Sequence, residues 1–203
     1  LMGHGIAQIF ALAGHETTIY DAFPTALEKG MAGIAGNLTI AVDKGYVTAD
    51  EAKKALPLVH ANPDLAAAVA DADFVFECAP EKMELKQGIF KNLDALCRPQ
   101  TILASNTSVM SITEIAATST NRGRIIGTHF WNPPYLIPLV EVVPTVDTAS
   151  ATVSRTTGSL AGAGQEPSHG QRDDPGFAAN HMQHARWRAA TQSAAEGRAD
   201  AAT

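Results

Sequence analysis

The pattern of hydrophobic positions at the start of the chain predicts a helix followed by a strand. Apolar residues recur at i, i+3, i+4 and i+7 from Ile6 to Ala13, so residues 3–13 are expected to form an amphipathic helix. Gly14 follows this segment, as glycine commonly does where a helix ends. Residues 17–20 are β-branched or aromatic, which favours a strand, and this run ends at Asp21.

Short apolar runs alternate with helical patterns along the rest of the chain as far as residue 161. Strands are predicted over residues 58–60, 73–78, 101–104, 124–129 and 139–143, and helices over residues 26–42, 65–70, 112–117 and 148–161. A capping box predicts a further short helix after Thr48. The helix after Cys78 should bury one face, made of Leu85, Ile89, Leu93 and Leu96. This alternation predicts an α/β fold of the doubly wound Rossmann type, with a mostly parallel sheet covered on both faces.

The character of the sequence changes near Gly162. Residues 162–171 are polar and rich in glycine, and residues 168–171 are poor strand material. Residues 174–176 read Asp-Pro-Gly, which predicts a turn, and residues 177–196 have helical propensity with a thin apolar face, mostly alanine. We therefore predict one α/β domain over residues 1–173 and the start of an all-helical second domain over residues 174–203.

Composition narrows the functional classes. The 203 residues carry a net charge of −6, and 45% of them are hydrophobic while 18% are charged, as is typical of a globular protein. The acidic balance argues against a general nucleic-acid-binding protein, which needs clustered Lys and Arg. It does not argue against a phosphate-bearing cofactor, because backbone amides at a helix start can bind phosphate. No apolar run is long enough to span a membrane.

Cysteine and histidine give no sign of crosslinks or of a metal. Cys78 and Cys97 end apolar patterns and are predicted to be buried thiols in a reducing compartment, which favours the cytoplasm. The histidines are scattered, and only His181 and His184 are close to each other, without an evident third ligand. We therefore expect no metal site.

The opening segment has the pattern of the second half of a dinucleotide-binding βαβ unit. A helix opened by Gly3 and Gly5, followed by a strand that ends in an acid, is where such folds bind the pyrophosphate and ribose of NAD. Asp21 would repel a 2′-phosphate, so NAD is favoured over NADP. In the fingerprint G-x-G-x-x-G, Gly3 can only be the third glycine. The preceding strand and glycines would then lie upstream of residue 1, so we expect a fragment that binds NADH weakly and is inactive by itself.

Polar residues fall at the predicted carboxyl ends of the strands, where the ligands of such sheets bind. His129 ends one of these strands, and Glu141 lies in the next. A histidine base with a carboxylate partner is what hydride transfer from an alcohol to NAD requires. The alternative is a structural histidine and a surface glutamate.

Two further groups of polar residues have an alternative structural explanation. Residues 105–108 read Ser-Asn-Thr-Ser and could bind a substrate hydroxyl, or Ser108 could simply cap the following helix. Glu81 and Lys86 open the helix after Cys78 and are either site residues or a first-turn acid and a solvated lysine. No G-x-S-x-G motif surrounds either serine, which argues against a hydrolase nucleophile.

Five motifs, in this order along the chain, resemble the NAD-binding domain of the 3-hydroxyacyl-CoA dehydrogenase family. They are MGHGIAQIFALAGHETTIYD, ECAPEKMELKQGIF, SNTSVMSI, GTHFWNPPYLIPLVEVV and DDPGFAAN. The resemblance covers nearly the whole chain. It implies the reversible, NAD-dependent oxidation of an L-3-hydroxyacyl-CoA to the 3-ketoacyl-CoA.

The resemblance also implies a role for each matching residue. Gly3 and Gly5 would lie by the pyrophosphate, and Asp21 would lie on the adenosine ribose. His129 would be the catalytic base and Glu141 its charged partner. The remaining site residues would be Glu81, Lys86 and Asn106 on the nicotinamide side, Ser108 and Asn180 beside the substrate hydroxyl or the histidine, and Asn132 in the substrate pocket. The family adds a helical C-terminal domain that closes the cleft and forms a homodimer.

Two alternatives stand beside this function. The Asn-Pro-Pro-Tyr-Leu-Ile-Pro-Leu run also resembles relatives that oxidise small 3-hydroxy compounds without CoA, such as L-gulonate and L-carnitine dehydrogenases, and no Lys/Arg cluster marks a CoA phosphate site. The second alternative is a non-catalytic protein of the same fold, like the lens crystallins related to this family. The sequence departs from the family pattern at residues 168–171 and at His181, where the family usually has Arg.

Overall fold

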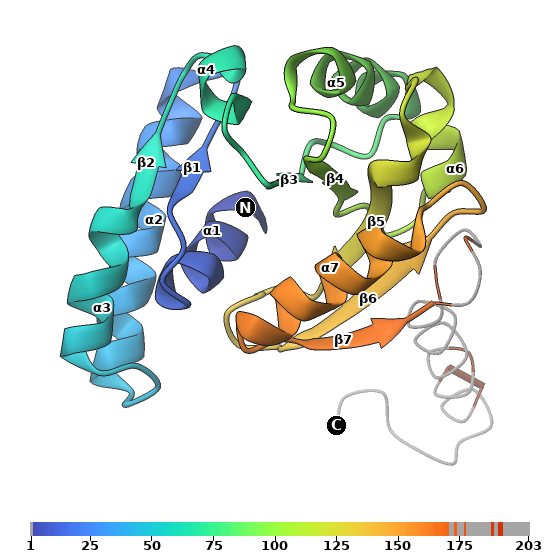
Figure 1. Cartoon of the computed structure of the whole chain (residues 1–203). Coiled ribbons are helices and arrows are strands. Elements are labelled where there is room, and N and C mark those ends of the chain that lie inside the picture. The colour runs from blue at the N-terminus through green and yellow to red at the C-terminus, as the bar shows by residue number, and fades with distance from the viewer. Residues whose placement is uncertain (1, 171–172, 174–176, 178–187, 189–190, 193–203) are drawn as a thin grey trace.

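Figure 1 shows a computed structural model of the chain, which describes residues 2–170, 173, 177, 188, 191 and 192. The strands are β1 (Thr17–Ile19), β2 (Val59–Ala61), β3 (Phe74–Glu77), β4 (Ile102–Ser105), β5 (Ile125–Phe130), β6 (Leu139–Pro144) and β7 (Glu166–His169). The α-helices are α1 (Met2–Leu12), α2 (Pro24–Asp43), α3 (Ala49–Ala55), α4 (Leu65–Val69), α5 (Met83–Leu96), α6 (Ile112–Ile115) and α7 (Ser150–Gly162). Short 3-10 helices are η1 (Leu56–Leu58), η2 (Ala116–Thr118) and η3 (Arg122–Arg124).

The strands form two hydrogen-bonded sheets. β1 pairs with β2 in parallel, and the other five strands form one sheet in the order β3-β4-β5-β6-β7. β3, β4 and β5 run parallel, β6 is antiparallel to β5, and β7 is parallel to β6. Helices connect the parallel neighbours, as the predicted α/β architecture requires. The mostly parallel, Rossmann-type sheet is therefore confirmed.

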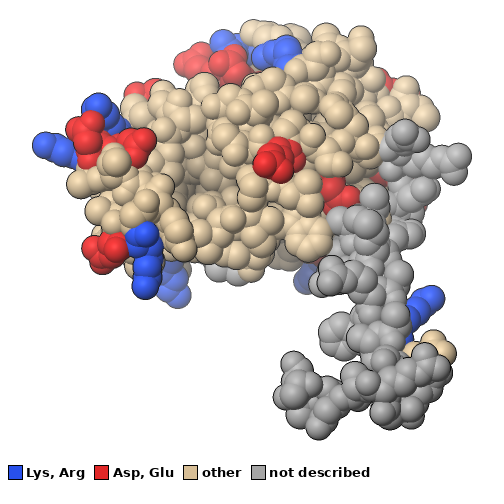
Figure 2. Space-filling model, turned by 90° about the horizontal axis from the view of Figure 1, so that it is seen from below, with Lys and Arg blue, Asp and Glu red and all other residues tan. Residues whose placement is uncertain are grey.

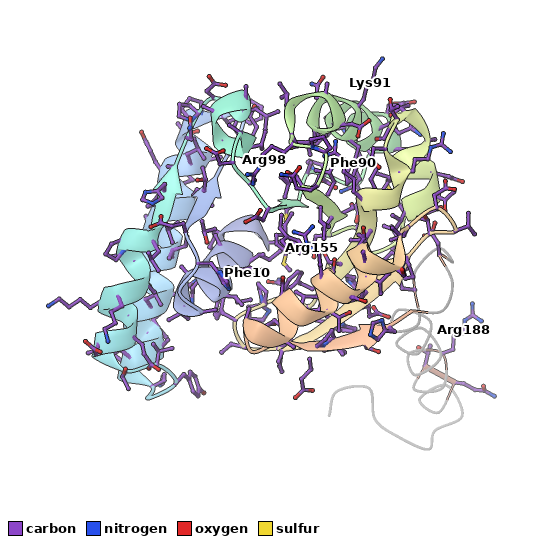
Figure 3. The ribbon with its side chains drawn as sticks, in the orientation of Figure 1. Phe10, Phe90, Lys91, Arg98, Arg155 and Arg188 are labelled. Carbon is purple, nitrogen blue, oxygen red and sulfur yellow. The ribbon has the colours of Figure 1, made fainter. Side chains whose placement is uncertain are left out.

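The five-stranded sheet has a hydrophobic layer on each face. Leu103 of β4 points into a cluster with Phe90 of α5 and with α6, while its neighbour Ala104 points into a cluster with Phe10 of α1 and with α7. Successive strand residues point to opposite faces, so one apolar strand supplies both layers. Phe10 and Phe90 mark these two layers in Figure 3.

Helix α1 is buried on more than the single stripe that the sequence predicts. Ile9 and Phe10 pack against the five-stranded sheet, whereas Ala7 and Ala11 pack against α2, α3 and β2. Ala13, the last residue of the predicted stripe, is exposed. Helix α1 therefore presents small alanine side chains to α2, α3 and β2, and large side chains to the five-stranded sheet.

The prediction for the buried face of α5 was right for Leu93, which is buried, and for Ile89, which is partly buried against the core. It was wrong for Leu85 and Leu96, which have 41% and 42% of their surface accessible, and it omitted the buried residues Lys86 and Phe90. Lys86, Phe90 and Leu93 follow the helical spacing i, i+4, i+7. The prediction counted only apolar residues as buried, whereas a lysine, Lys86, occupies an inward position on α5. In Figure 3, Lys91 points away from the protein while the adjacent Phe90 points inward.

The polar segment after Gly162 forms a strand, which corrects the expectation that it is poor strand material. β7 pairs with the edge of β6, and Val142 is in register with His169. Most of its side chains are exposed. A strand at the edge of a sheet is held by backbone hydrogen bonds to one neighbour, so polar side chains are tolerated there.

The remaining element predictions up to residue 161 are confirmed, with shifts of a few residues at the ends. α1 ends before Gly14, which has a φ of +87° that favours glycine. The Thr48 side chain and Glu51 form the predicted capping box at the start of α3. The predicted turn at residues 174–176, most of the helix over residues 177–196, and Asn180, His181 and His184 lie outside the described residues.

In the part of the chain that the structure describes, no helix has both the length and the hydropathy to cross a membrane. Figure 2 shows one face of the molecule, on which Lys and Arg lie near the outline and form no continuous basic patch. This face therefore lacks the clustered positive charge that nucleic-acid binding requires.

Candidate active site

The candidate site lies at the carboxyl end of the parallel strands. Glu77 at the end of β3 is in register with Ser105 at the end of β4, and Ser105 is in turn in register with Gly127 of β5. The loops that follow β3 and β4 therefore emerge next to the last residues of β5. The predicted site residues of these loops share one edge of the sheet, where ligands of such folds bind.

The structure brings His129 and Glu141 into direct contact. They face each other across the antiparallel β5–β6 pair, and His129 Nδ1 lies 2.8 Å from Glu141 Oε2. Both are buried, with 6% and 5% of their surfaces exposed. When the Nδ1–H group donates a hydrogen bond to this carboxylate, Nδ1 keeps its proton and the basic lone pair of the imidazole lies on Nε2. The pair thus has the geometry of a base held by an acidic partner, and it is not a surface glutamate beside an unrelated histidine.

Two aromatic rings accompany the imidazole of His129. Its ring centroid lies 5.8 Å from that of Trp131 and 5.9 Å from that of Phe177, with tilts of 38° and 50°. The contacts restrict the rotation of the imidazole about its side-chain bonds. Sequence reasoning did not assign a role to either ring.

Glu81 connects the loop after β3 to the loop after β4. Its carboxylate accepts hydrogen bonds from the Thr107 hydroxyl at 2.8 and 2.9 Å and from the Ser108 N–H at 2.8 Å. Glu81 also precedes α5, so it is not the first-turn acid of that helix. The carboxylate fixes the backbone at Ser108, one of the predicted site residues.

Ser108 does not cap the following helix, contrary to the structural alternative. The N-cap of α6 is Ser111, whose hydroxyl accepts from the Glu114 N–H. Asp173 completes this cap, because its carboxylate accepts from the Ser111 hydroxyl at 2.7 Å and from the N–H groups of Ile112 and Thr113 at 2.8 and 2.7 Å. The acid lies 62 residues from Ser111 in sequence, so local patterns could not reveal this partner, although the predicted helix over residues 112–117 begins at the observed residue.

Asn106 links β4 to the segment that carries the histidine. Its Oδ1 accepts a hydrogen bond from the Phe130 N–H at 2.9 Å, and its own N–H donates to the Glu77 carbonyl oxygen at 2.9 Å. Phe130 directly follows His129. Asn106 therefore fixes the distance between the ends of three neighbouring strands.

Lys86 is not the solvated lysine of the structural alternative. Only 1% of its surface is exposed, and its ammonium donates to Glu77 Oε1 at 2.8 Å, Glu77 Oε2 at 3.0 Å and the Ala79 carbonyl at 3.0 Å. Sequence reasoning missed Glu77, which ends an apolar strand. The available signal was Lys86 itself, because a lysine on the inward face of an amphipathic helix needs a buried acid.

The start of α1 also lies at the carboxyl end of the parallel strands. A Cβ atom placed on Gly3 would lie 3.9 Å from the side chain of Cys78, which directly follows β3. A Cβ atom on Gly5 would lie only 2.7 Å from Pro134, so glycine is required there for the close approach of the loop after β5. The N–H groups at the first turn of α1 point along the helix axis, as pyrophosphate binding requires.

Asp21 follows β1, and its Oδ1 accepts from the Phe23 N–H at 2.9 Å. This turn holds the carboxylate just beyond the carboxyl end of a parallel strand. An acid in this position suits the ribose hydroxyls of a dinucleotide. The residues present thus fit a dinucleotide at its phosphate and its ribose.

The two cysteines are free, and their titration argues against a reactive thiol. Burial and the nearby Glu77 charge raise the pKa of Cys78 to about 12, so this residue is a neutral thiol at physiological pH. Burial also raises the pKa of Cys97. Among the described residues, no cluster of three or more His, Cys, Asp or Glu side chains could hold a metal ion.

Asn132 lies in the loop after β5, where the Asn132–Pro133 peptide bond is cis. The neighbouring Tyr135 contacts α2 through a hydrogen bond of 3.3 Å to Asn37. This loop therefore contacts α2 through Tyr135 and α1 through Pro134, which lies against Gly5. Asn180 falls outside the described residues, so its predicted role stays a prediction.

The fold and the residues at its carboxyl edge define an NAD-binding α/β domain of the Rossmann type. Residues 1–172 match the family described as "3-hydroxyacyl-CoA dehydrogenase, NAD binding domain". The chain therefore belongs to this family of oxidoreductases, and its cofactor is NAD.

Three relatives illustrate the range of the family. The chain is 40% identical over 181 residues to the 3-hydroxybutyryl-CoA dehydrogenase of Bradyrhizobium diazoefficiens, covering 89% of this chain and 61% of that protein. It is 37% identical over 202 residues to the L-carnitine dehydrogenase of Streptomyces griseus, covering 100% of this chain and 59% of that protein. The solved (S)-3-hydroxybutyryl-CoA dehydrogenase of Ralstonia eutropha matches with a TM-score of 0.91 and 31% identity, over 98% of this chain and 70% of that structure. The chain thus spans less than two thirds of the two curated relatives.

Proposed function

We propose that this protein oxidises the 3-hydroxyl of an L-3-hydroxyacyl-CoA to a ketone by hydride transfer to NAD. The observation that carries this proposal is the buried His129–Glu141 pair at the carboxyl edge of the sheet. NAD, when bound, supplies the acceptor for the hydride that leaves C3 of the substrate. His129 Nε2 takes the proton of the C3 hydroxyl. The C3–H and O–H bonds therefore break, and the C3–O single bond becomes a C=O double bond.

Glu141 stabilises the positive charge that develops on His129. The carboxylate accepts the Nδ1–H bond, which keeps Nε2 as the basic nitrogen before the proton arrives and faces the imidazolium afterwards. Burial of both groups reduces screening by water, so their attraction is stronger than at a surface.

The other predicted site residues receive supporting roles. Gly3 and Gly5 would let the start of α1 approach the pyrophosphate, and Asp21 would bind the adenosine ribose and disfavour NADP. Asn132 would shape the substrate pocket. The remaining residues would act around the nicotinamide and the substrate hydroxyl: Glu81, Lys86 and Asn106 on the nicotinamide side, and Ser108 and Asn180 beside the hydroxyl or His129.

Further features of the proposal concern the whole protein. A domain boundary near residue 173, a helical second domain and a homodimer would complete the cleft over His129. The contact of Phe177 with the His129 ring supports a second domain over the base, because Phe177 follows the proposed boundary in sequence. A reducing, cytoplasmic setting accords with the two free thiols.

One experiment separates the leading substrate class from its competitor. The match to the L-carnitine dehydrogenase of Streptomyces griseus covers the entire length of this chain. This match favours a small 3-hydroxy acid without CoA as the second candidate substrate. The protein, expressed from its complete reading frame, is assayed with NADH and acetoacetyl-CoA, and with NAD and L-carnitine or L-gulonate. We expect turnover with acetoacetyl-CoA. Turnover only with L-carnitine or L-gulonate would contradict the acyl-CoA assignment and retain the hydride chemistry.

The base is tested by the substitution His129→Gln in the same full-length protein. We expect kcat to fall by about a thousandfold, because a glutamine side chain cannot take the hydroxyl proton. NADH affinity, measured by fluorescence titration, should stay unchanged. A variant that keeps its turnover would overturn the assignment of His129.

A further inference from the structure

A buried network surrounds Glu77, a residue to which the proposed function gives no role. Glu77 Oε1 accepts hydrogen bonds from the Ala79 N–H at 2.6 Å and from Lys86 Nζ at 2.8 Å. Glu77 Oε2 accepts from the Ser105 hydroxyl at 2.7 Å. The side chains of Glu77 and Lys86 are only 3% and 1% exposed, and Ser105 is fully buried. The carboxylate therefore has several charge-assisted hydrogen bonds and no contact with bulk water.

The network leads directly to the candidate site. Lys86 Nζ lies 3.7 Å from Glu81 Oε2, and Glu81 in turn binds the Ser108 N–H. The backbone carbonyl of Glu77 accepts from the Asn106 N–H. Glu77 is thus connected to the loop after β3 through Lys86 and to the loop after β4 through Asn106 and Ser105.

We propose that Glu77 is a positioning residue, which acts with Ser105 and Lys86 to hold Glu81 and Asn106 at the nicotinamide side of the site. This inference rests on the proposed placement of Glu81 and Asn106 beside the cofactor. The physical reason is that two separate loops must present polar atoms at a fixed distance, and a small displacement of such atoms weakens binding and catalysis. A buried ion pair contributes little net stability compared with apolar packing, so its value here lies in fixing geometry.

The opposite end of β4 offers a matched control. Thr101 directly precedes β4 and is fully buried. Its hydroxyl donates a hydrogen bond to the Ala72 carbonyl at 2.6 Å. Ser105 at the other end donates to Glu77 at 2.7 Å. Each hydroxyl joins β4 to the β3 side of the sheet, so the substitutions Ser105→Ala and Thr101→Val each remove one buried hydrogen bond between these segments, to the Glu77 carboxylate and to a backbone carbonyl respectively.

The test compares these two variants with the parent full-length protein, well below their melting temperatures. NADH affinity is measured by fluorescence titration. The values of kcat and of KM for NADH are measured by steady-state kinetics with acetoacetyl-CoA as the second substrate. We expect Ser105→Ala to weaken NADH affinity and raise KM for NADH by about tenfold. Thr101→Val should leave both values unchanged while still lowering the melting temperature. Equal NADH affinities in the two variants would overturn the proposal.

Glu77 itself is tested by Glu77→Gln and by the double variant Glu77→Gln/Lys86→Met, which folds without a buried, uncompensated ammonium. Both should weaken NADH affinity more than Ser105→Ala does, and Glu77→Asp should restore part of the loss. NADH affinity equal to that of the parent protein in the double variant would contradict a positioning role. The titration does not depend on turnover, so a parent protein that reduces no 3-keto substrate would refute the proposed reaction and still leave the positioning of Glu81 and Asn106 measurable.

Discussion

The two ends of the five-stranded sheet each bury an ion pair, and the pairs differ in what surrounds them. At the carboxyl end, Lys86 binds Glu77 at 2.8 Å. At the amino end, Arg124 binds Asp94 at 2.8 Å, also with both side chains mostly buried. Lys86 and Asp94 both belong to α5, so one helix supplies a charged residue to each end of the sheet.

The difference lies in the next contacts along each network. The guanidinium of Arg124 also donates to the backbone carbonyls of Arg98 and Thr101, so this pair closes the turn before β4. Lys86 instead approaches Glu81, which holds the loop of Ser108. A buried charge alone therefore does not identify a functional site, whereas a buried charge that supports side chains beside a histidine base does.

A cavity is no better as a marker by itself. A hollow of about 360 Å³ lies at the amino end and is lined by Asp94, Arg124 and neighbouring residues. Asp94 and Arg124 in its lining are already paired with each other. We therefore assign chemistry to the carboxyl end and stability to the amino end, and the following variants test this division.

The largest effect is expected for Glu141→Gln at the carboxyl end. A neutral amide cannot stabilise the imidazolium of His129, so kcat should fall by about a thousandfold. NADH affinity and melting temperature should change little, because the glutamine side chain has the same size and can still accept the Nδ1–H bond. Steady-state kinetics and a fluorescence titration check this. An unchanged kcat would remove Glu141 from the mechanism.

The next effect concerns α5, which joins the two ends. Phe90→Ala should lower the free energy of unfolding by about 3 kcal/mol, because it empties a fully buried site. Leu85→Ala, on the exposed face of the same helix, should change it by less than about 0.5 kcal/mol. Urea denaturation of both variants measures this difference. Equal losses would mean that the buried face of α5 is assigned incorrectly.

A smaller effect is expected for Asp94→Asn at the amino end. The variant should lose about 2 kcal/mol of stability, since hydrogen bonds to a charged group are replaced by weaker ones to an amide. The values of kcat and KM should not change at a temperature well below unfolding. Asp50→Asn is the control, because Asp50 forms an exposed pair with Lys54. A fall in kcat for Asp94→Asn would contradict a purely structural role.

The smallest effect is a pH dependence of the same pair. Burial would raise the pKa of Asp94, but hydrogen bonds from Arg124 and from the N–H groups of Thr120 and Asn121 outweigh it and lower the pKa below its ordinary value of 3.8. Since the unfolded chain then binds protons more readily, this stabilisation is present above about pH 4 and is lost as the pH falls through the folded-state pKa. The difference in melting temperature between the parent protein and Asp94→Asn should therefore shrink in acid. A constant difference would exclude a pKa shift at Asp94.

The sequence was sufficient for the parts of the fold that depend on local periodicity. The glycine-opened helix and the apolar strands were predicted because each depends on residues near each other in sequence. The His129–Glu141 pair was predicted because the two residues lie on consecutive strands, only 12 residues apart. The site roles of these residues stay predictions.

The remaining features depend on contacts between distant segments. The helix start at residue 112 was predicted, but its additional cap by Asp173 was not, and β7 is a strand because its backbone pairs with β6. The inward position of Lys86 on α5 was missed because Lys86 is neutralised by Glu77, an acid that ends an apolar strand. In each case the partner lies on another element, and no local pattern reveals it.

The most direct test of the division between the two ends measures kcat and the free energy of unfolding for Glu141→Gln and Asp94→Asn in parallel. The account predicts that Glu141→Gln loses kcat and keeps its stability, whereas Asp94→Asn loses stability and keeps its kcat. If both variants lost activity and stability in proportion, the two ends would not have separate roles, and the assignment of the catalytic centre to the carboxyl end would be contradicted.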